Sequence, residues 1–188
     1  MWLVVGLGNP THKFDFTRHN TGFMAADSLV SKLDFPKGTL EFHQNKKLGA
    51  RIVKTNIYGE DIIIAKPTSF MNNSGIAVKK LLDFYKISSD RLVVICDDSN
   101  LNVAILRLRY GGDPGGHRGL ESIIETIGSE FWRARVGIGQ NRGMTLENYV
   151  LAKIPPEERK KIDAALDKLS EELISLISHG ALASKTIN

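Results

Sequence analysis

Short apolar runs that alternate with helix-like segments constrain the fold of this chain more than any other feature. The runs LVV at residues 3–5 and LVVIC at residues 92–96 are continuously apolar, which is typical of strands buried on both faces of a sheet. Further strands are expected at residues 51–54, 61–65, 106–109 and 133–139, and helices at residues 21–32, 74–85, 120–127 and from 155 onward. Because strands and helices interleave, we predict an α/β sandwich around a twisted mixed sheet.

Length and composition bound the class of protein. With 188 residues, of which 42% are hydrophobic, the chain suffices for one well-buried domain over residues 1–188 but is short for two. The net charge of +4 is explained by solvated surface lysines as well as by nucleic-acid binding. Cys96 is the single cysteine, which excludes an internal disulfide and a cysteine-rich zinc site.

The chain opens into a strand without a charged leader, and no apolar run approaches the ~20 residues of a membrane span. We therefore expect a cytoplasmic protein without membrane contact.

Two glycines, at positions 6 and 8, follow the first expected strand. In a dinucleotide-binding fingerprint the third glycine would stand at position 11, which is Thr11, so that interpretation fails. The two glycines still allow a tight turn at the carboxyl end of a strand, the edge where ligands bind in open α/β sheets. We therefore expect Asn9 to present its amide into a cleft.

The segment TRHN at residues 17–20 carries the clearest chemical signal. Histidine is the side chain whose unperturbed charge change falls between about pH 5 and 8, and Arg18 would offer a fork of donors to a phosphate. These residue types on a loop favour a proton-transfer site beside an anionic substrate. His19 is therefore the candidate general base.

Polar groups elsewhere in the sequence could complete this site. Asp97 and Asp98 end a buried strand, where a carboxylate can hold an imidazole in one tautomer; alternatively, both are solvated loop residues or metal ligands. Asn72 either caps a helix or donates to a developing oxyanion, and His117 is either a packed residue or a site residue. Cys96 lies inside an apolar strand and is expected to be inert. With no nucleophile beside a base and no metal set, attack by a base-activated water is the simplest chemistry.

Four arginines lie on two expected strands. Alternation places Arg107 and Arg109 on one face of the first strand, opposite two leucines, while Arg133 and Arg135 share a face of the second. The four side chains either form one basic face or are ordinary solvated surface.

Taken together, these segments resemble the bacterial-type peptidyl-tRNA hydrolases. The matching blocks are GLGNP at 6–10, TRHNTGF at 17–23, KPTSFMNNSG at 66–75, DD at 97–98, GGHRGL at 115–120, RVGIG at 135–139 and YVL at 149–151. The resemblance implies hydrolysis of the ester between a peptidyl group and the 3′ end of tRNA, by a monomer without a metal, cofactor or obligate protein partner. It identifies His19 with the base that activates water and Asp97 with its orienting carboxylate. Asn9 matches the position that senses the blocked substrate, and Asn72 matches the amide that stabilises the transition state.

The resemblance also identifies binding positions. Those of the substrate cleft are Phe14, Asn20, Phe70, Met71, Asn72, His117 and Arg118, and those that contact the phosphates of the acceptor stem are Arg107, Arg109 and Arg135. The chain departs from the family pattern at Phe14 (usually tyrosine), Arg118 (asparagine), Glu121 (lysine), Asn100 (aspartate) and Asn102 (proline). We expect these departures to affect tRNA affinity rather than the chemistry.

Two other functions fit parts of the sequence. One is a non-catalytic RNA-binding relative on the same fold. The departures at Phe14, Arg118 and Asn100 favour it, but the presence of His19, Asp97, Asn9 and Asn72 does not. The other is an esterase or amidase for small molecules, whose activity would barely respond to salt, whereas binding through phosphates weakens steeply with ionic strength.

Overall fold

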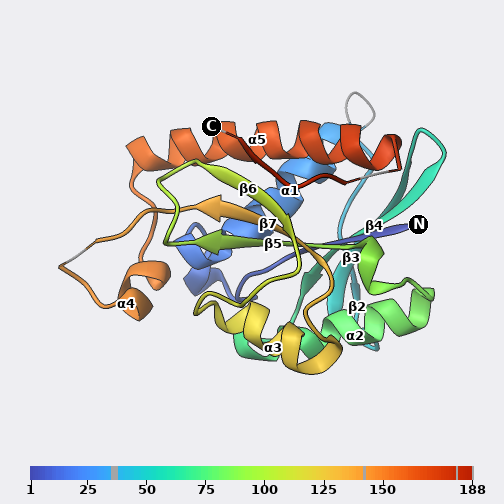
Figure 1. The fold of residues 1–188 in the computed structure, drawn as a ribbon, viewed down its shortest axis with the longest axis horizontal. Helices are drawn as coiled ribbons and strands as arrows, with labels where there is room; N and C mark the ends of the chain where they lie inside the picture. Colours follow the sequence, from blue (N-terminus) through green and yellow to red (C-terminus); the bar gives the residue numbers. More distant parts are fainter. Residues whose placement is uncertain (35–37, 142, 181, 188) are drawn as a thin grey trace.

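The computed structural model describes residues 1–34, 38–141, 143–180 and 182–187. All strands among them join one eight-stranded sheet, in the order β2-β3-β4-β1-β5-β7-β6-β8 (Figure 1). The strands are β1 (Trp2–Gly6), β2 (His43–Asn45), β3 (Ala50–Ile57), β4 (Glu60–Pro67), β5 (Leu92–Asp98), β6 (Leu106–Tyr110), β7 (Trp132–Gly137) and β8 (Lys185–Ile187). The α-helices are α1 (Thr21–Asp34), α2 (Ser74–Tyr85), α3 (Arg118–Ile127), α4 (Leu146–Leu151) and α5 (Pro156–Ser178). The predicted α/β sandwich around a mixed sheet is confirmed.

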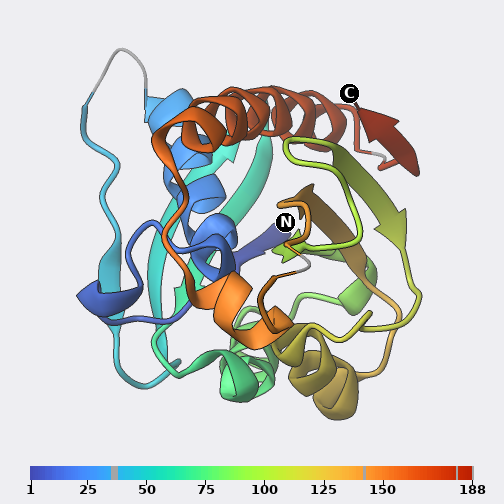
Figure 2. The same ribbon diagram turned by 90° about the vertical axis from the view of Figure 1, so that its left-hand side faces the viewer.

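Helices cover both faces of the sheet, as Figures 1 and 2 show: α1 and α5 lie on one face, and α2 and α3 on the other. Side chains alternate along each central strand, so Val4 packs on the α1/α5 side while Leu3 and Val5 pack on the α2/α3 side. Burial on both faces explains why these strands are continuously apolar in sequence.

The four central strands, β4, β1, β5 and β7, run parallel to one another. Their carboxyl ends therefore meet at one edge, with the residues that follow β1 and β4 beside the last residues of β5. The chain leaves β1 through α1 on one face and enters β5 through α2 on the other. This change of face marks β1 and β5 as a topological switch point, where ligands bind in open α/β sheets.

Three glycines bring the start of α1 directly against the strand ends. A Cβ on Gly6 would lie 2.1 Å from the carbonyl oxygen of Gly22, and a Cβ on Gly22 would lie 2.4 Å from that of Ile95. A Cβ on Gly8 would lie 2.6 Å from the ring of Phe23. Gly6 and Gly8 are thus required for close approach, rather than for a turn with positive φ. This packing carries the residues just before α1, among them His19, over the end of β5.

Most expected elements are present, including the antiparallel β3–β4 pair joined at Tyr58-Gly59 and the long helix that begins after Pro155. The short elements β2, β8 and α4 were not expected. Within the described ranges, no helix combines the length and the apolar character that crossing a membrane requires.

Candidate active site

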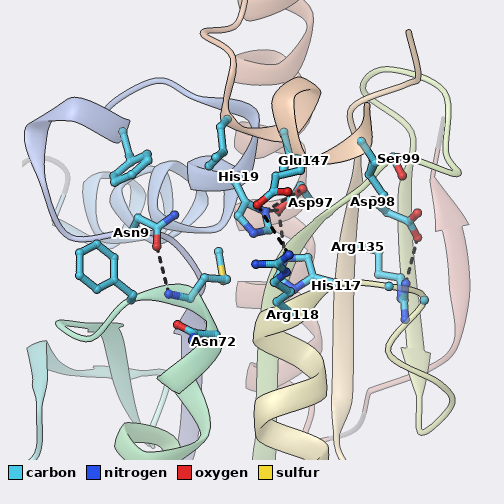
Figure 3. A pocket seen from close by; sticks show the side chains of 18 residues that line it. Asn9, His19, Asn72, Asp97, Asp98, Ser99, His117, Arg118, Arg135 and Glu147 are labelled. Carbon is cyan, nitrogen blue, oxygen red and sulfur yellow. Dashed lines mark hydrogen bonds and ion pairs between the residues drawn. The ribbon is translucent and has the colours of Figure 1, made fainter. Parts of the chain in front are cut away.

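A cavity of about 510 Å³ opens at the carboxyl edge of the parallel strands (Figure 3). Ten of the candidate residues line it: Asn9, Phe14, His19, Phe70, Met71, Asn72, Asp97, His117, Arg118 and Arg135. It is also lined by Asp98, Ser99, Gly115, Gly116, Leu146, Glu147, Val150 and Leu151. Asp98, the two glycines and the YVL block were among the matching segments, whereas Ser99, Leu146 and Glu147 carried little signal in the sequence. Leu146 and Glu147 lie on α4, which is short and reaches the cavity only through long-range packing.

His19 and Asp97 form a buried hydrogen-bonded pair in this cavity. Nδ1 of His19 lies 2.9 Å from Oδ1 and 3.2 Å from Oδ2 of Asp97. A carboxylate only accepts, so Nδ1 carries the proton and Nε2 keeps the lone pair that a general base needs. Hydroxyl groups on either side fix the short turn that carries the ring: Thr17 donates to Phe14 O at 2.8 Å, and Thr21 donates to Arg18 O at 2.6 Å.

The charges of this pair shift both pKa values. Burial lowers the pKa of His19, but the negative charge and the hydrogen bond of Asp97 outweigh it, so the pKa lies above 6.5; the guanidinium of Arg118 acts in the opposite direction. Burial raises the pKa of Asp97, but His19 and His117 hold that pKa well below its usual range. Asp97 is therefore ionised at neutral pH and favours the imidazolium form of His19.

His117 reaches the same carboxylate. Its Nε2 lies 3.1 Å from Asp97 Oδ1, while its Nδ1 accepts the backbone N–H groups of Gly119 at 3.1 Å and Leu120 at 3.2 Å. The His117 side chain is thus the N-cap of α3 as well as a donor to Asp97. Of the two roles considered for His117, packed residue or site residue, the structure combines both.

His19, Asp97 and His117 also have the spacing of a metal site, since one ligand atom from each lies within 4.8 Å of the others. To bind a metal there, His117 would need an unprotonated Nε2. The two amides directed at Nδ1 instead require the lone pair on Nδ1 and the proton on Nε2. The donor set therefore favours a hydrogen-bonded cluster over a metal centre.

Asn9 and Asn20 occupy different layers of the site. The Oδ1 of Asn9 accepts the N–H of Met71 at 3.0 Å, which leaves its amide nitrogen for the cavity. Asn20, which was expected in the cleft, does not line the cavity. Its carboxamide instead accepts the N–H of Asn9 at 2.8 Å and donates to Asn9 O at 3.1 Å, so Asn20 holds Asn9 in place from behind.

Asn72 lines the cavity from the short turn before α2, directly after Met71. It is exposed, and its side chain hydrogen-bonds to no other described residue. The residue at the N-cap position of α2 is Asn73. Of the two interpretations of Asn72, helix cap or cavity donor, the geometry favours the second.

Arg18 does not face a ligand, contrary to the expectation that it would offer donors to a phosphate. It is 4% exposed, donates to Glu158 at 2.6 Å and stacks on the ring of Tyr149 at 4.2 Å. It also donates to Lys153 O at 3.2 Å. Arg18 thus ties the loop of His19 to α4 and α5, and α4 forms one wall of the cavity.

The four strand arginines differ in accessibility. β6 and β7 pair Arg107 with Arg135 and Arg109 with Arg133. Arg135 lines the cavity, held by Asp98 at 3.2 Å and by Asp113 O at 2.7 Å. Arg107 is half-buried and Arg109 exposed, and neither lines the cavity. Arg133 is fully buried against Phe131, so it cannot belong to a basic surface.

Arg118 extends across the cavity from α3 towards α4. Its guanidinium lies 3.6 Å from the carboxylate of Glu147, and both side chains are largely exposed (Figure 3). Cys96, by contrast, is fully buried, and burial raises the pKa of its thiol, as expected for an inert residue.

A buried carboxylate, a histidine with a free Nε2 and amides facing the same cavity, at the edge of a mixed α/β sheet, are the groups that suit a hydrolase acting through a base-activated water. Comparison with known proteins places it more narrowly. The family model for peptidyl-tRNA hydrolase matches residues 3–188. The chain therefore belongs to the peptidyl-tRNA hydrolase family.

Individual relatives agree with this assignment. A peptidyl-tRNA hydrolase from Lachnoclostridium phytofermentans is 41% identical over 183 residues, which cover 96% of this chain and 93% of that protein. The crystal structure of the peptidyl-tRNA hydrolase from Acinetobacter baumannii is 33% identical, with a TM-score of 0.87 over 96% of this chain and 89% of its own. A mutant of the Acinetobacter protein gives a TM-score of 0.89 at 32% identity, with the same coverage of both chains.

Proposed function

We propose that this chain hydrolyses the ester bond of peptidyl-tRNA through His19, releasing a peptide and reusable tRNA. The observation that carries the proposal is the buried contact of 2.9 Å between His19 Nδ1 and Asp97, which fixes the tautomer whose Nε2 can accept a proton. Because peptidyl-tRNA arises in translation, we also propose a cytoplasmic location for this single domain.

In the proposed reaction, Nε2 of His19 takes a proton from water, and the resulting hydroxide attacks the carbonyl carbon of the ester. The negative charge that develops on the carbonyl oxygen is met by the amide of Asn72, a donor that carries no charge of its own. The bond from the carbonyl carbon to the ribose oxygen then breaks, and the imidazolium returns its proton to that oxygen. Asp97 stabilises the imidazolium during this cycle.

The cavity walls suggest how the substrate lies. Phe14, Phe70 and Met71 supply an apolar wall for the peptide or the terminal base. Beside them, the amide nitrogen of Asn9 would donate to the carbonyl oxygen of the acyl group that blocks the substrate's amino group. Arg135 lines the other side and is paired across the strands with Arg107. We propose that Arg135, Arg107 and Arg109 contact phosphates of the acceptor stem, since such contacts position RNA without reading its sequence.

The test is release of tRNA from an N-acetylated aminoacyl-tRNA, with the unblocked aminoacyl-tRNA as the matched control. We expect cleavage of the blocked form alone, and a KM that rises steeply with salt. Binding of the blocked form without cleavage would identify a non-catalytic RNA-binding relative. Cleavage of small esters that is insensitive to salt would identify a small-molecule esterase instead.

A further inference from the structure

One carboxylate oxygen serves two imidazoles in this site. Asp97 Oδ1 accepts an N–H from His19 at 2.9 Å and another from His117 at 3.1 Å. The two rings lie 4.8 Å apart between centroids, inclined by 45°. Of these two imidazoles, the reaction described above uses only that of His19, so the contact between His117 and Asp97 has no role in it.

We propose that His117 is a positioning residue, which fixes the Asp97 carboxylate and takes up part of its negative charge so that His19 is oriented without being held permanently as imidazolium. This inference rests on the proposed role of His19 as the base. It assigns His117 an effect that acts through Asp97 rather than through contact with the substrate.

The orientation of His117 is set by α3 and not by the ligand. Two backbone N–H groups at the start of the helix point at Nδ1, so the proton must sit on Nε2, and Nε2 faces Asp97. The His117 side chain is buried, and turning its ring over would direct a C–H at the helix amides. A donor to Asp97 is therefore built into the fold before any substrate binds.

The second donor matters because Asp97 has two opposing effects. Its charge keeps the proton on Nδ1 of His19 and stabilises the imidazolium, but a carboxylate with a single donor would bind that imidazolium more tightly. A general base works best when its pKa lies near the operating pH. The charged groups that face His19 are Asp97 from β5, Arg118 from α3 and Glu147 from α4. Of the residues around His19, His117 is the one that hydrogen-bonds to the same oxygen of Asp97 as His19 does.

Two substitutions separate the two hydrogen-bonding functions of His117. In His117→Asn, the amide oxygen stands near the position of Nδ1 and can keep the helix cap, but the side chain is too short to reach Asp97. In His117→Gln, the amide nitrogen can reach the position of Nε2 and donate to Asp97, but the cap is lost. The pair therefore forms a matched control within one position.

The direct readout is an NMR titration of the His19 ring in the full-length protein. In His117→Asn we expect the pKa of His19 to rise by about 0.5–1 pH unit because Asp97 has lost a donor, and kcat to fall about 10-fold. In His117→Gln we expect the wild-type titration, but a Tm that is lower by about 2–4 °C from the lost cap.

An unchanged His19 titration in folded His117→Asn would overturn the proposal, as would a titration altered in His117→Gln. If His117→Asn does not fold, His117→Leu takes its place, because it removes the donor to Asp97 together with the cap. A raised His19 pKa in His117→Leu beside the wild-type titration in His117→Gln supports the role, and the wild-type titration in both variants contradicts it. The titration involves no turnover, so it tests His117 separately from the assignment of His19 as the base.

Discussion

Replacing Asp97 by asparagine changes one charge at the centre of the site and keeps nearly the same shape. In the wild type both N–H groups directed at Asp97 meet a full negative charge. The carboxamide introduced by D97N can accept one of them through its oxygen, but its NH2 group can also donate to Nδ1 of His19. That second arrangement moves the proton of His19 to Nε2, where it blocks the base.

The expected loss of activity follows from two contributions. A hydrogen bond to a charged group contributes about 1.5–3 kcal/mol, and each ~1.4 kcal/mol of transition-state stabilisation is a factor of about 10 in rate. Loss of the charge alone should therefore lower kcat about 10–100-fold. The blocked tautomer adds to this, which gives a total of about 10²–10⁴-fold.

The pH dependence of kcat/KM tests the role of Asp97 independently, through the direction in which its acid limb moves. In the wild type kcat/KM should fall as the pH drops through the raised pKa of His19, above 6.5. D97N removes the two causes that raise this pKa and leaves burial, which lowers it, so the acid limb should move to lower pH. The assay is kcat/KM for N-acetyl-aminoacyl-tRNA between about pH 5 and 9.

The matched control is D98N, which removes the neighbouring carboxylate that binds Arg135 instead of a histidine. D98N should raise KM and leave the acid limb close to its wild-type position. A D97N enzyme with the wild-type rate and profile would refute the role of Asp97.

Four further predictions follow from the geometry. Arg118→Asn removes a positive charge that lowers the pKa of His19, so the acid limb of kcat/KM should move up by a few tenths of a pH unit; an unmoved limb would contradict this effect. Arg109→Ala should raise KM several-fold and reduce the salt slope of tRNA binding by about 1, whereas Lys161→Ala, on the outer helix α5, should change neither. Arg18→Ala leaves Glu158 without its partner and should cost about 3 kcal/mol in the free energy of unfolding, measured by urea denaturation; an unchanged midpoint would show that this ion pair does not hold the loop. Treatment with a chelator should leave kcat within about twofold, because the tautomer of His117 disfavours a metal; loss of activity that Zn²⁺ restores would contradict the hydrogen-bonded arrangement.

Much of the fold could be predicted because its central strands are buried on both faces. Short, continuously apolar runs such as that of β5 fit few structures other than a strand buried on both faces. The parallel arrangement of these strands brings their carboxyl ends together. This is why Asn9, Met71 and Asp97, which are far apart in the sequence, line one cavity. The elements that were missed, β2, β8 and α4, are short and depend on partners distant in the sequence, such as β6 for β8.

The finer roles within the site could not be predicted from residue type. Arg18 has the chemistry of a phosphate ligand, but Glu158 and Tyr149, from the far end of the chain, enclose it. Asn20 resembles a cleft residue, but its two amide atoms match the backbone of Asn9. His117 shows its tautomer only once the amides of α3 are in place. In each case the partner, and not the residue itself, decides the role.

The most direct measurement is the single-turnover rate of N-acetyl-aminoacyl-tRNA hydrolysis by His19→Ala at saturating enzyme, with tRNA affinity measured in parallel. If His19 is the base, the rate should fall by about 10²–10⁴-fold while the affinity for tRNA stays close to that of the wild type. A variant that cleaves the ester as fast as the wild type would contradict the central claim.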